Sequence, residues 1–174
     1  IYTSLKKGEG EAAYTQERVR MKKGKIFSIN HSKIKGISKT PVKSALLIEG
    51  VGIDKDAHAG GGLRQVSLLS IESIRKQKEC DKVKKTGFLL EPGDFAENIT
   101  TEGVDLSALK IGDRLRLGQN AIIEISKIGK DCHKYCAIYY KIGDCIMPRE
   151  GMFASVLKGG IIKIGDGLEV IENA

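Results

Sequence analysis

Residues 87–128 read GFLLEPGDFAENITTEGVDLSALKIGDRLRLGQNAIIEISKI, and this stretch decides the fold class. Residues typical of turns interrupt it at 92–93, 103, 111–113 and 119–120. Between these turns, the sequence predicts a short strand over 95–101, about one helical turn over 106–109, and a hairpin that joins 115–118 to 121–126. Many short strands separated by turns are typical of β-barrels.

The amino-terminal flank continues this pattern. Residues 25–32 alternate in polarity and predict a first strand, which a polar loop over 33–39 follows. Residues 63–70 predict a further strand. Ser70 then suits the N-cap of one exposed amphipathic helix over 71–85, because a serine oxygen can accept a bond from a free amide of the first turn.

The carboxyl-terminal flank predicts one more helix and a final hairpin. We expect a short helix over 149–157 that the glycines at 159–160 end. Residues 161–172 are expected to close the chain as a hairpin. The fold class expected is therefore mostly β (α+β), an antiparallel β-barrel with two or three peripheral helices.

Length and composition predict one ordinary domain. Residues 1–20 precede Met21 and are expected to be a tag or disordered extension, which leaves 21–174 as a single domain. No apolar run reaches the roughly eighteen residues that a membrane span needs, so we expect no membrane partner. The cysteines are clustered and no leader precedes them, which favours a cytoplasmic protein with free thiols.

The net charge of +7 suits either a nucleic acid or an anionic small molecule. Aromatic residues make up only 5% of the chain, tryptophan is absent, and no basic segment alternates with aromatic residues as in single-strand binders. No recognition-helix pattern stands out either. We therefore expect an anionic small molecule and no nucleic acid.

The main candidate for chemistry is a cysteine cluster in 129–160, GKDCHKYCAIYYKIGDCIMPREGMFASVLKGG. Cys132, Cys136 and Cys145 each lie close to a basic residue, and positive charge favours the thiolate, which attacks or binds metal. The alternative is that they are small buried apolar residues. A zinc site of these cysteines with His133 is a weaker alternative, because adjacent ligands and a CxxxC spacing are awkward for zinc.

A glycine-rich loop over 50–62 is the second candidate feature. Its glycines permit close approach of the backbone to a ligand, although such loops are more often plain connections. Lys43, His58 and Arg64 flank it with three other charged residues, and His58 has no histidine partner at a zinc-binding spacing. No Ser-His-Asp set or convincing carboxylate pair supports hydrolase chemistry.

Four ordered segments resemble the MOSC domain, found at the carboxyl end of molybdenum cofactor sulfurases, which are linked to pyridoxal phosphate. They are PVKSALLIEGVGIDKDAHAGGGLRQVSLLS, EPGDFAENITTEGVDLSALKIGDRLRLG, ISKIGKDCHKYC and GMFASVLKGGIIKIGDGLEV. The likeness runs over about 24–172. It implies a β-barrel and either sulfur transfer through a cysteine that carries persulfide sulfur or, as an alternative, binding or delivery of the molybdenum cofactor (molybdopterin). A cysteine desulfurase or a molybdoenzyme would be the partner.

The resemblance also implies roles for particular residues. Cys132 corresponds to the cysteine after the long hairpin, and Cys145 lies where amidoxime-reducing relatives have a molybdenum-ligating cysteine. The family's GEN motif falls on 96–98, with Ala96 in place of glycine. The residues expected to hold the cofactor or other anionic groups are Lys43, His58, Arg64, Ser67, Ser70, Asn98, Thr100 and Arg149, and the reactive thiol is expected among Cys145, Cys132 and Cys136.

Overall fold

A computed structural model describes residues 22–132 and 134–171. Its strands are β1 (Lys23–His31), β2 (Thr40–Val42), β3 (Ser44–Ile48), β4 (Gly52–Ile53), β5 (Val66–Ser70), β6 (Ile99–Glu102), β7 (Arg114–Leu117), β8 (Ala121–Ile128), β9 (Met152–Lys158), β10 (Gly160–Lys163) and β11 (Gly167–Ile171). The helices are α2 (Ile71–Lys78), α3 (Asp81–Lys84), the 3-10 turn η1 (Leu106–Ala108), α4 (Ala137–Ile142) and α5 (Met147–Glu150). The expected extension over 1–20 lies outside the described residues.

Seven strands close into a barrel. They follow the order β11-β7-β8-β9-β5-β6-β1, and β1 pairs with β11 to complete the circle, while β2 adds to β1 outside it. The expected β-barrel is thus confirmed. The neighbours β5 and β6 run parallel, because the chain passes through α2 and α3 between them, and so the sheet is mixed.

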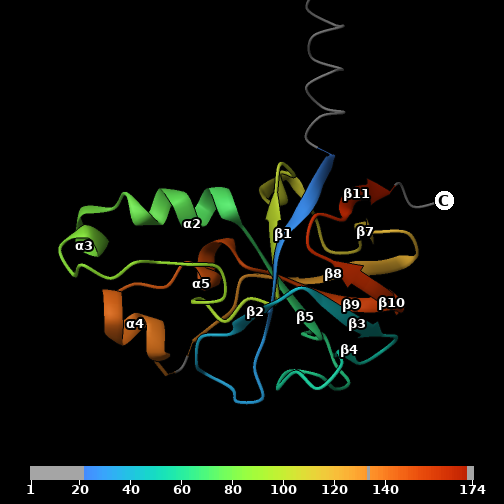
Figure 1. The fold of residues 1–174 in the computed structure, drawn as a ribbon, viewed down its shortest axis with the longest axis horizontal. Coiled ribbons are helices and arrows are strands. Elements are labelled where there is room, and N and C mark those ends of the chain that lie inside the picture. Colours follow the sequence, from blue (N-terminus) through green and yellow to red (C-terminus); the bar gives the residue numbers. More distant parts are fainter. Residues whose placement is uncertain (1–21, 133, 172–174) are drawn as a thin grey trace, which may run out of the picture.

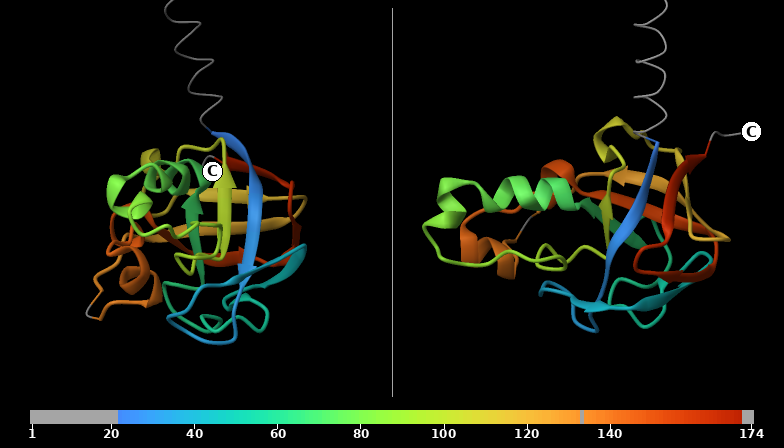
Figure 2. Two further views of the ribbon diagram at one scale, coloured as in Figure 1. Left: turned by 60° about the vertical axis from the view of Figure 1, so that its left-hand side comes forward. Right: turned by 45° about the horizontal axis from the view of Figure 1, so that its top comes forward.

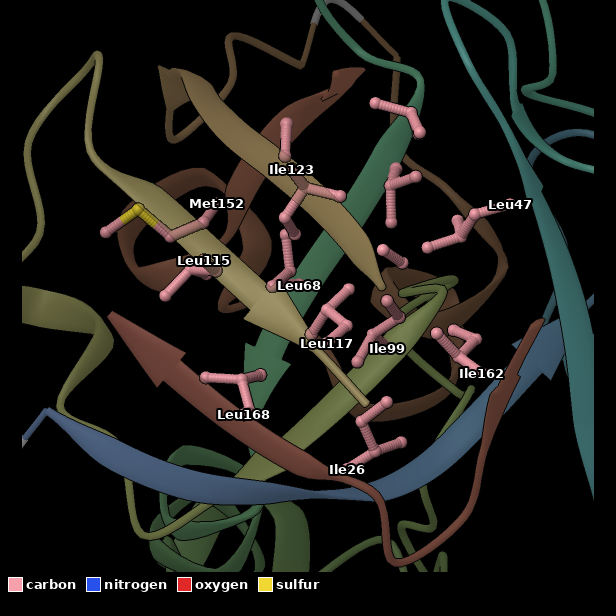
Figure 3. Close-up of a cluster of buried hydrophobic side chains, with 14 of the residues drawn as sticks. Ile26, Leu47, Leu68, Ile99, Leu115, Leu117, Ile123, Met152, Ile162 and Leu168 are labelled. Atoms are coloured by element: carbon pink, nitrogen blue, oxygen red, sulfur yellow. The ribbon is translucent and has the colours of Figure 1, made fainter. Parts of the chain in front are cut away.

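Apolar side chains fill the barrel, as Figure 3 shows for residues from several of its strands. Ile26, Leu68 and Ile99 are fully buried in this core. A small sheet of β10, β3 and β4 covers the barrel and contributes Leu47 and Ile162 to the same core. The interior of the barrel is therefore a packed apolar core.

The helices gather on one side of the barrel, where Figures 1 and 2 show α2, α3, α4 and α5 together. They enclose a second apolar cluster that is separate from the barrel core. Its buried members include Ile74, Ile142, Cys145 and Phe153, and Cys136 packs against it. Two of the candidate cysteines thus lie at the edge of this helical side. In the part of the chain that the structure describes, no helix is both long and apolar enough to span a membrane.

The hairpin at 114–128 is confirmed, with Leu115 opposite Ile123, and so is the helical turn after residue 105. Ser70 caps α2 as expected, since its side chain accepts a bond from the amide of Ser73. The single helix expected over 71–85 is instead two, α2 and α3, with a break at 79–80.

Three other expectations were wrong. Residues 152–158 form strand β9, because the chain there pairs with both β5 and β8, and only Met147–Glu150 are helical. The last two strands form no hairpin, because β10 pairs with β3 and β11 with β7 and β1. The strand expected from 95 begins only at Ile99, because Ala96 has a left-handed backbone with φ of 60°.

Candidate functional site

The structure brings the three clustered cysteines to one hollow of about 160 Å³ beside α4 and α5. Cys132 lies in the loop after β8, Cys136 at the N-cap of α4, and Cys145 in the turn between α4 and α5. The residues that line the hollow are Cys132, Tyr135, Cys136, Tyr139, Asp144, Cys145, Pro148 and Arg149.

Helix α4 and the turn after it position Cys136 and Cys145. Ile138 and Ile142 anchor α4 in the second apolar cluster. Gly143 then ends the helix in the left-handed region, with φ of 69°, where glycine is favoured, and its carbonyl accepts a bond from Lys82 Nζ at 2.6 Å. This reversal of the chain brings Cys145 back toward Cys136.

Cys136 and Cys145 form a hydrogen-bonded pair with one ionised member. The thiol of Cys145 donates to the sulfur of Cys136, and this bond is the largest cause that lowers the pKa of Cys136 to about 5. Partial burial opposes the shift, whereas the amides of Tyr139 and Ile138 and the charge of Lys130 add to it. The same bond, together with burial, raises the pKa of Cys145. At neutral pH, Cys136 is therefore the thiolate and Cys145 the thiol.

Asp144 holds the turn in place. Its carboxylate accepts two bonds from Arg149, at 3.1 and 2.9 Å, one from Gln77 of α2 at 3.0 Å, and one from the backbone amide of Cys145 at 2.8 Å. These bonds lower the pKa of Asp144, and the bond from Arg149 is the largest cause. The guanidinium of Arg149, a residue expected from the sequence to hold a ligand anion, thus binds Asp144.

Aromatic side chains form one wall of the hollow. The rings of Tyr135 and Tyr139 stack with centroids 3.7 Å apart and planes 4° from parallel. Cys132 is exposed at the same hollow, whereas Cys145 is only 7% exposed. The role of these tyrosines was not predicted from the sequence, although the spacing of four residues between Tyr135 and Tyr139 is the one that places side chains on the same face of a helix.

Three of the expected ligand-binding residues are buried and form hydrogen bonds within the protein, namely Ser67, Asn98 and Thr100. Ser67 Oγ donates to Asn98 Oδ1 at 3.0 Å and accepts from the Asn98 amide at the same distance. Thr100 Oγ1 accepts from Asn30 Nδ2 at 3.1 Å and donates to Glu97 Oε1 at 2.9 Å. These groups join β1, β5 and β6, and none of them lines the cysteine hollow.

The other expected residues are spread over the surface. Lys43 is exposed between β2 and β3, and His58 lies with its Nδ1 3.5 Å from the carboxylate of Asp56. Arg64 is exposed above the ring of Phe153, with 5.6 Å between guanidinium carbon and ring centroid. The structure therefore groups Arg149 with the cysteines and leaves these three outside the lining of their hollow.

The comparison with protein families decides what this barrel is. The model described as "MOSC domain" matches residues 55–169, which is more than half of the chain. The chain belongs to the MOSC domain family. A comparison with curated proteins finds no match.

Solved structures share the MOSC domain fold. YuaD of Bacillus subtilis superposes with a TM-score of 0.69 at 21% identity, over 87% of this chain and 97% of that one. YiiM of Geobacillus stearothermophilus gives 0.65 at 23% identity, over 86% of this chain and 75% of that one. YiiM of Escherichia coli gives 0.66 at 19% identity, over 87% and 71%. At these identities the likeness establishes the fold alone.

The described residues of this MOSC domain do not fit an intact molybdenum cofactor around Cys145. Cys145 is only 7% exposed and packs in the second apolar cluster, so a bulky group cannot approach its sulfur. A hollow of about 160 Å³ is also smaller than the ~300 Å³ at which small-molecule sites begin. Ser70, Lys76 and Arg149 line a larger hollow of about 670 Å³, but the carboxylates of Glu72, Asp105 and Glu150 line it as well and outnumber its cations, which disfavours a phosphate.

A metal site of the zinc type has no support either. Among residues 22–132 and 134–171, no group of three or more His, Cys, Asp or Glu side chains is arranged to hold a metal ion. His133, the fourth ligand of the zinc alternative, lies outside the described residues. The hollow is thus best suited to thiol chemistry on a small group.

Proposed function

We propose that this MOSC domain accepts and passes on sulfur through Cys136, which bears the sulfur as a persulfide. The observation that supports this is the hydrogen-bonded pair of Cys136 and Cys145 at a shared hollow, in which Cys136 is the half-buried, ionised member. A thiolate attacks sulfur far faster than a thiol does. The reactive cysteine of the sulfur-transfer hypothesis is therefore Cys136, ahead of Cys145 and Cys132.

The transfer step needs a donor persulfide, for which a cysteine desulfurase is the expected class of protein. The Cys136 thiolate attacks the outer sulfur of the donor, a bond forms between the two sulfurs, and the donor thiolate leaves with the electrons of the broken bond. Cys136 then bears one additional sulfur atom. The size of the hollow, about 160 Å³, suits this group of one or two sulfur atoms.

The acceptor of this sulfur is proposed from the family resemblance. A molybdenum cofactor, or an enzyme that carries it, would take the sulfur from Cys136 at the exposed side of the hollow, where Cys132 lies. We derive no step on the cofactor itself, because the described residues around Cys145 do not fit it. Delivery of a bound cofactor without sulfur transfer remains the alternative hypothesis.

Sulfur loading can be assigned to one cysteine by peptide mass. The reduced full chain is incubated with a cysteine desulfurase and L-cysteine, sampled promptly into an alkylating reagent, and digested with trypsin. Cleavage after Lys130, Lys134, Lys141 and Arg149 separates Cys132, Cys136 and Cys145 into three peptides. We expect one added sulfur on peptide 135–141.

A matched pair of variants provides the controls. Cys136→Ser should lose the added sulfur, and Cys80→Ser should retain it, because Cys80 is exposed between α2 and α3 and does not line the hollow. Equal loading of the Cys136→Ser variant would refute the proposal. A noncovalent molybdopterin mass on unloaded protein purified from cells that make the cofactor would support the delivery alternative instead.

A further inference from the structure

Resting on that proposed function, we infer that Cys145 is a resolving cysteine, which releases the sulfur of the Cys136 persulfide as hydrogen sulfide and forms a Cys136–Cys145 disulfide. The domain would then be a reductive sulfur-releasing unit and not only a carrier. The geometry supports this, since both cysteines line one small hollow and Cys136 packs against the apolar cluster that contains Cys145.

The position of Cys145 suits attack on the inner sulfur of the persulfide. Cys145 is 7% exposed and packs in the second apolar cluster, so a donor protein cannot reach it directly. Among the described residues, Cys136 is the cysteine whose side chain interacts with Cys145. An incoming sulfur therefore reaches Cys136 before Cys145, and Cys145 lines the same hollow as the persulfide that forms.

The bond changes balance without any oxidant. The sulfur of Cys145 bonds to the sulfur of Cys136, and the bond between the Cys136 sulfur and the outer sulfur breaks. The outer sulfur leaves with that electron pair and the proton of Cys145, as hydrogen sulfide. It is reduced while the two cysteine sulfurs are oxidised to a disulfide, which a dithiol protein of the thioredoxin type must reduce before the next cycle.

The test measures sulfide and disulfide in the same sample. The reduced full chain is loaded with glutathione persulfide, desalted, and incubated without a reductant. For the wild-type chain, we expect one sulfide per loaded chain and a disulfide that links peptides 135–141 and 142–149. Cys145→Ser should load on peptide 135–141 but release no sulfide until dithiothreitol is added. Serine retains a hydroxyl donor toward Cys136, so we expect the variant to load more slowly than the wild-type chain, and its loading is allowed to run to completion.

The outcomes separate the two proposals. If the wild-type chain gains neither an added sulfur nor a disulfide at Cys136, the proposed function fails. If Cys145→Ser loads and releases sulfide as fast as the wild-type chain, only the resolving role of Cys145 is refuted. A disulfide between the peptides of Cys132 and Cys136 would also refute it, by assigning that role to Cys132.

Discussion

The ammonium group of Lys39 lies between both carboxylate oxygens of Asp56, 2.9 and 2.8 Å from them, and both side chains are almost completely buried. The pair joins the loop after β1 to the glycine-rich loop after β4. Asp56 also accepts bonds from the amides of Ser32 and His58. This ion pair and these bonds therefore hold the glycine-rich loop against the loop after β1.

Removal of one partner of this pair should destabilise the fold strongly. Lys39→Met leaves the Asp56 carboxylate buried without a counter-charge, and we expect a loss of about 3–5 kcal/mol in the free energy of unfolding. Lys78→Met, which breaks the more exposed pair with Glu91, should cost less than about 1 kcal/mol. Urea unfolding followed by circular dichroism measures both variants. Adding Asp56→Asn to Lys39→Met should recover part of the loss, and an equal loss in both single variants would contradict the argument.

A second prediction concerns the ionisation of Cys136. Its pKa of about 5 predicts that alkylation by iodoacetamide stays fast down to mildly acidic pH. Cys145→Ala removes the hydrogen bond that is the largest cause of the low pKa of Cys136. The pH at which the alkylation rate of Cys136 reaches half of its maximum, the midpoint, should therefore rise. Cys145→Ser retains a donor and should shift it less. Peptide mapping of alkylation against pH measures this, with Cys80 as the internal reference. A midpoint near the usual ~8.5 in the wild-type chain would refute the assignment.

The sequence predicted the parts of the fold that local chemistry determines. The hairpin at 114–128 has its own turn residues, and Ser70 provides its own cap, so both were correct. Residues 152–158 were expected to be helical, because their strand character comes from pairing with β5 and β8, which lie far away in the chain. Long-range pairing of this kind overrides weak local propensity.

The candidate site was predicted in part for the same reason. The spacing of Cys132, Cys136 and Cys145 indicated a thiol cluster, but which thiol is ionised depends on a hydrogen bond across nine residues of chain and on burial. Lys39 was expected only in a polar loop, because no local pattern shows that Asp56 lies against it. Charge type is visible in a sequence, whereas the partner of each charge is not.

A third prediction follows from Glu97, whose carboxyl is fully buried. Burial raises its pKa to about 7, against the effect of bonds from the Gly93 amide and Thr100. The pKa of Glu97 in the folded chain lies above its unfolded value of 4.5, so the folded chain holds this proton more tightly. The contribution of this proton to the free energy of unfolding is therefore complete below about pH 4.5 and is lost as the pH rises through 7. Glu97→Gln cannot ionise, so the wild-type chain should lose about 3 kcal/mol relative to this variant between pH 4 and 8. Parallel urea unfolding curves across this range measure the difference, and a constant difference would contradict the prediction.

A final prediction concerns Ala96, a residue with a Cβ in the left-handed backbone region. Its φ of 60° places it in the left-handed region, which costs a residue with a Cβ about 1–2 kcal/mol. Glycine removes this cost, but it also raises the conformational entropy of the unfolded chain, which lowers the free energy of unfolding by up to about 1 kcal/mol. Ala96→Gly should therefore stabilise the protein slightly.

The opposite change, Gly93→Ala, should destabilise the protein much more, because φ there is 94° and a Cβ would clash with the carbonyl oxygen of Lys39. Gly36→Ala provides the matched control, since its φ of 81° imposes a similar backbone strain but no atom lies within 4 Å of the added Cβ. Thermal unfolding of the three variants measures the order, and a Gly93→Ala variant no less stable than Gly36→Ala would show that the contact with Lys39 relaxes without cost.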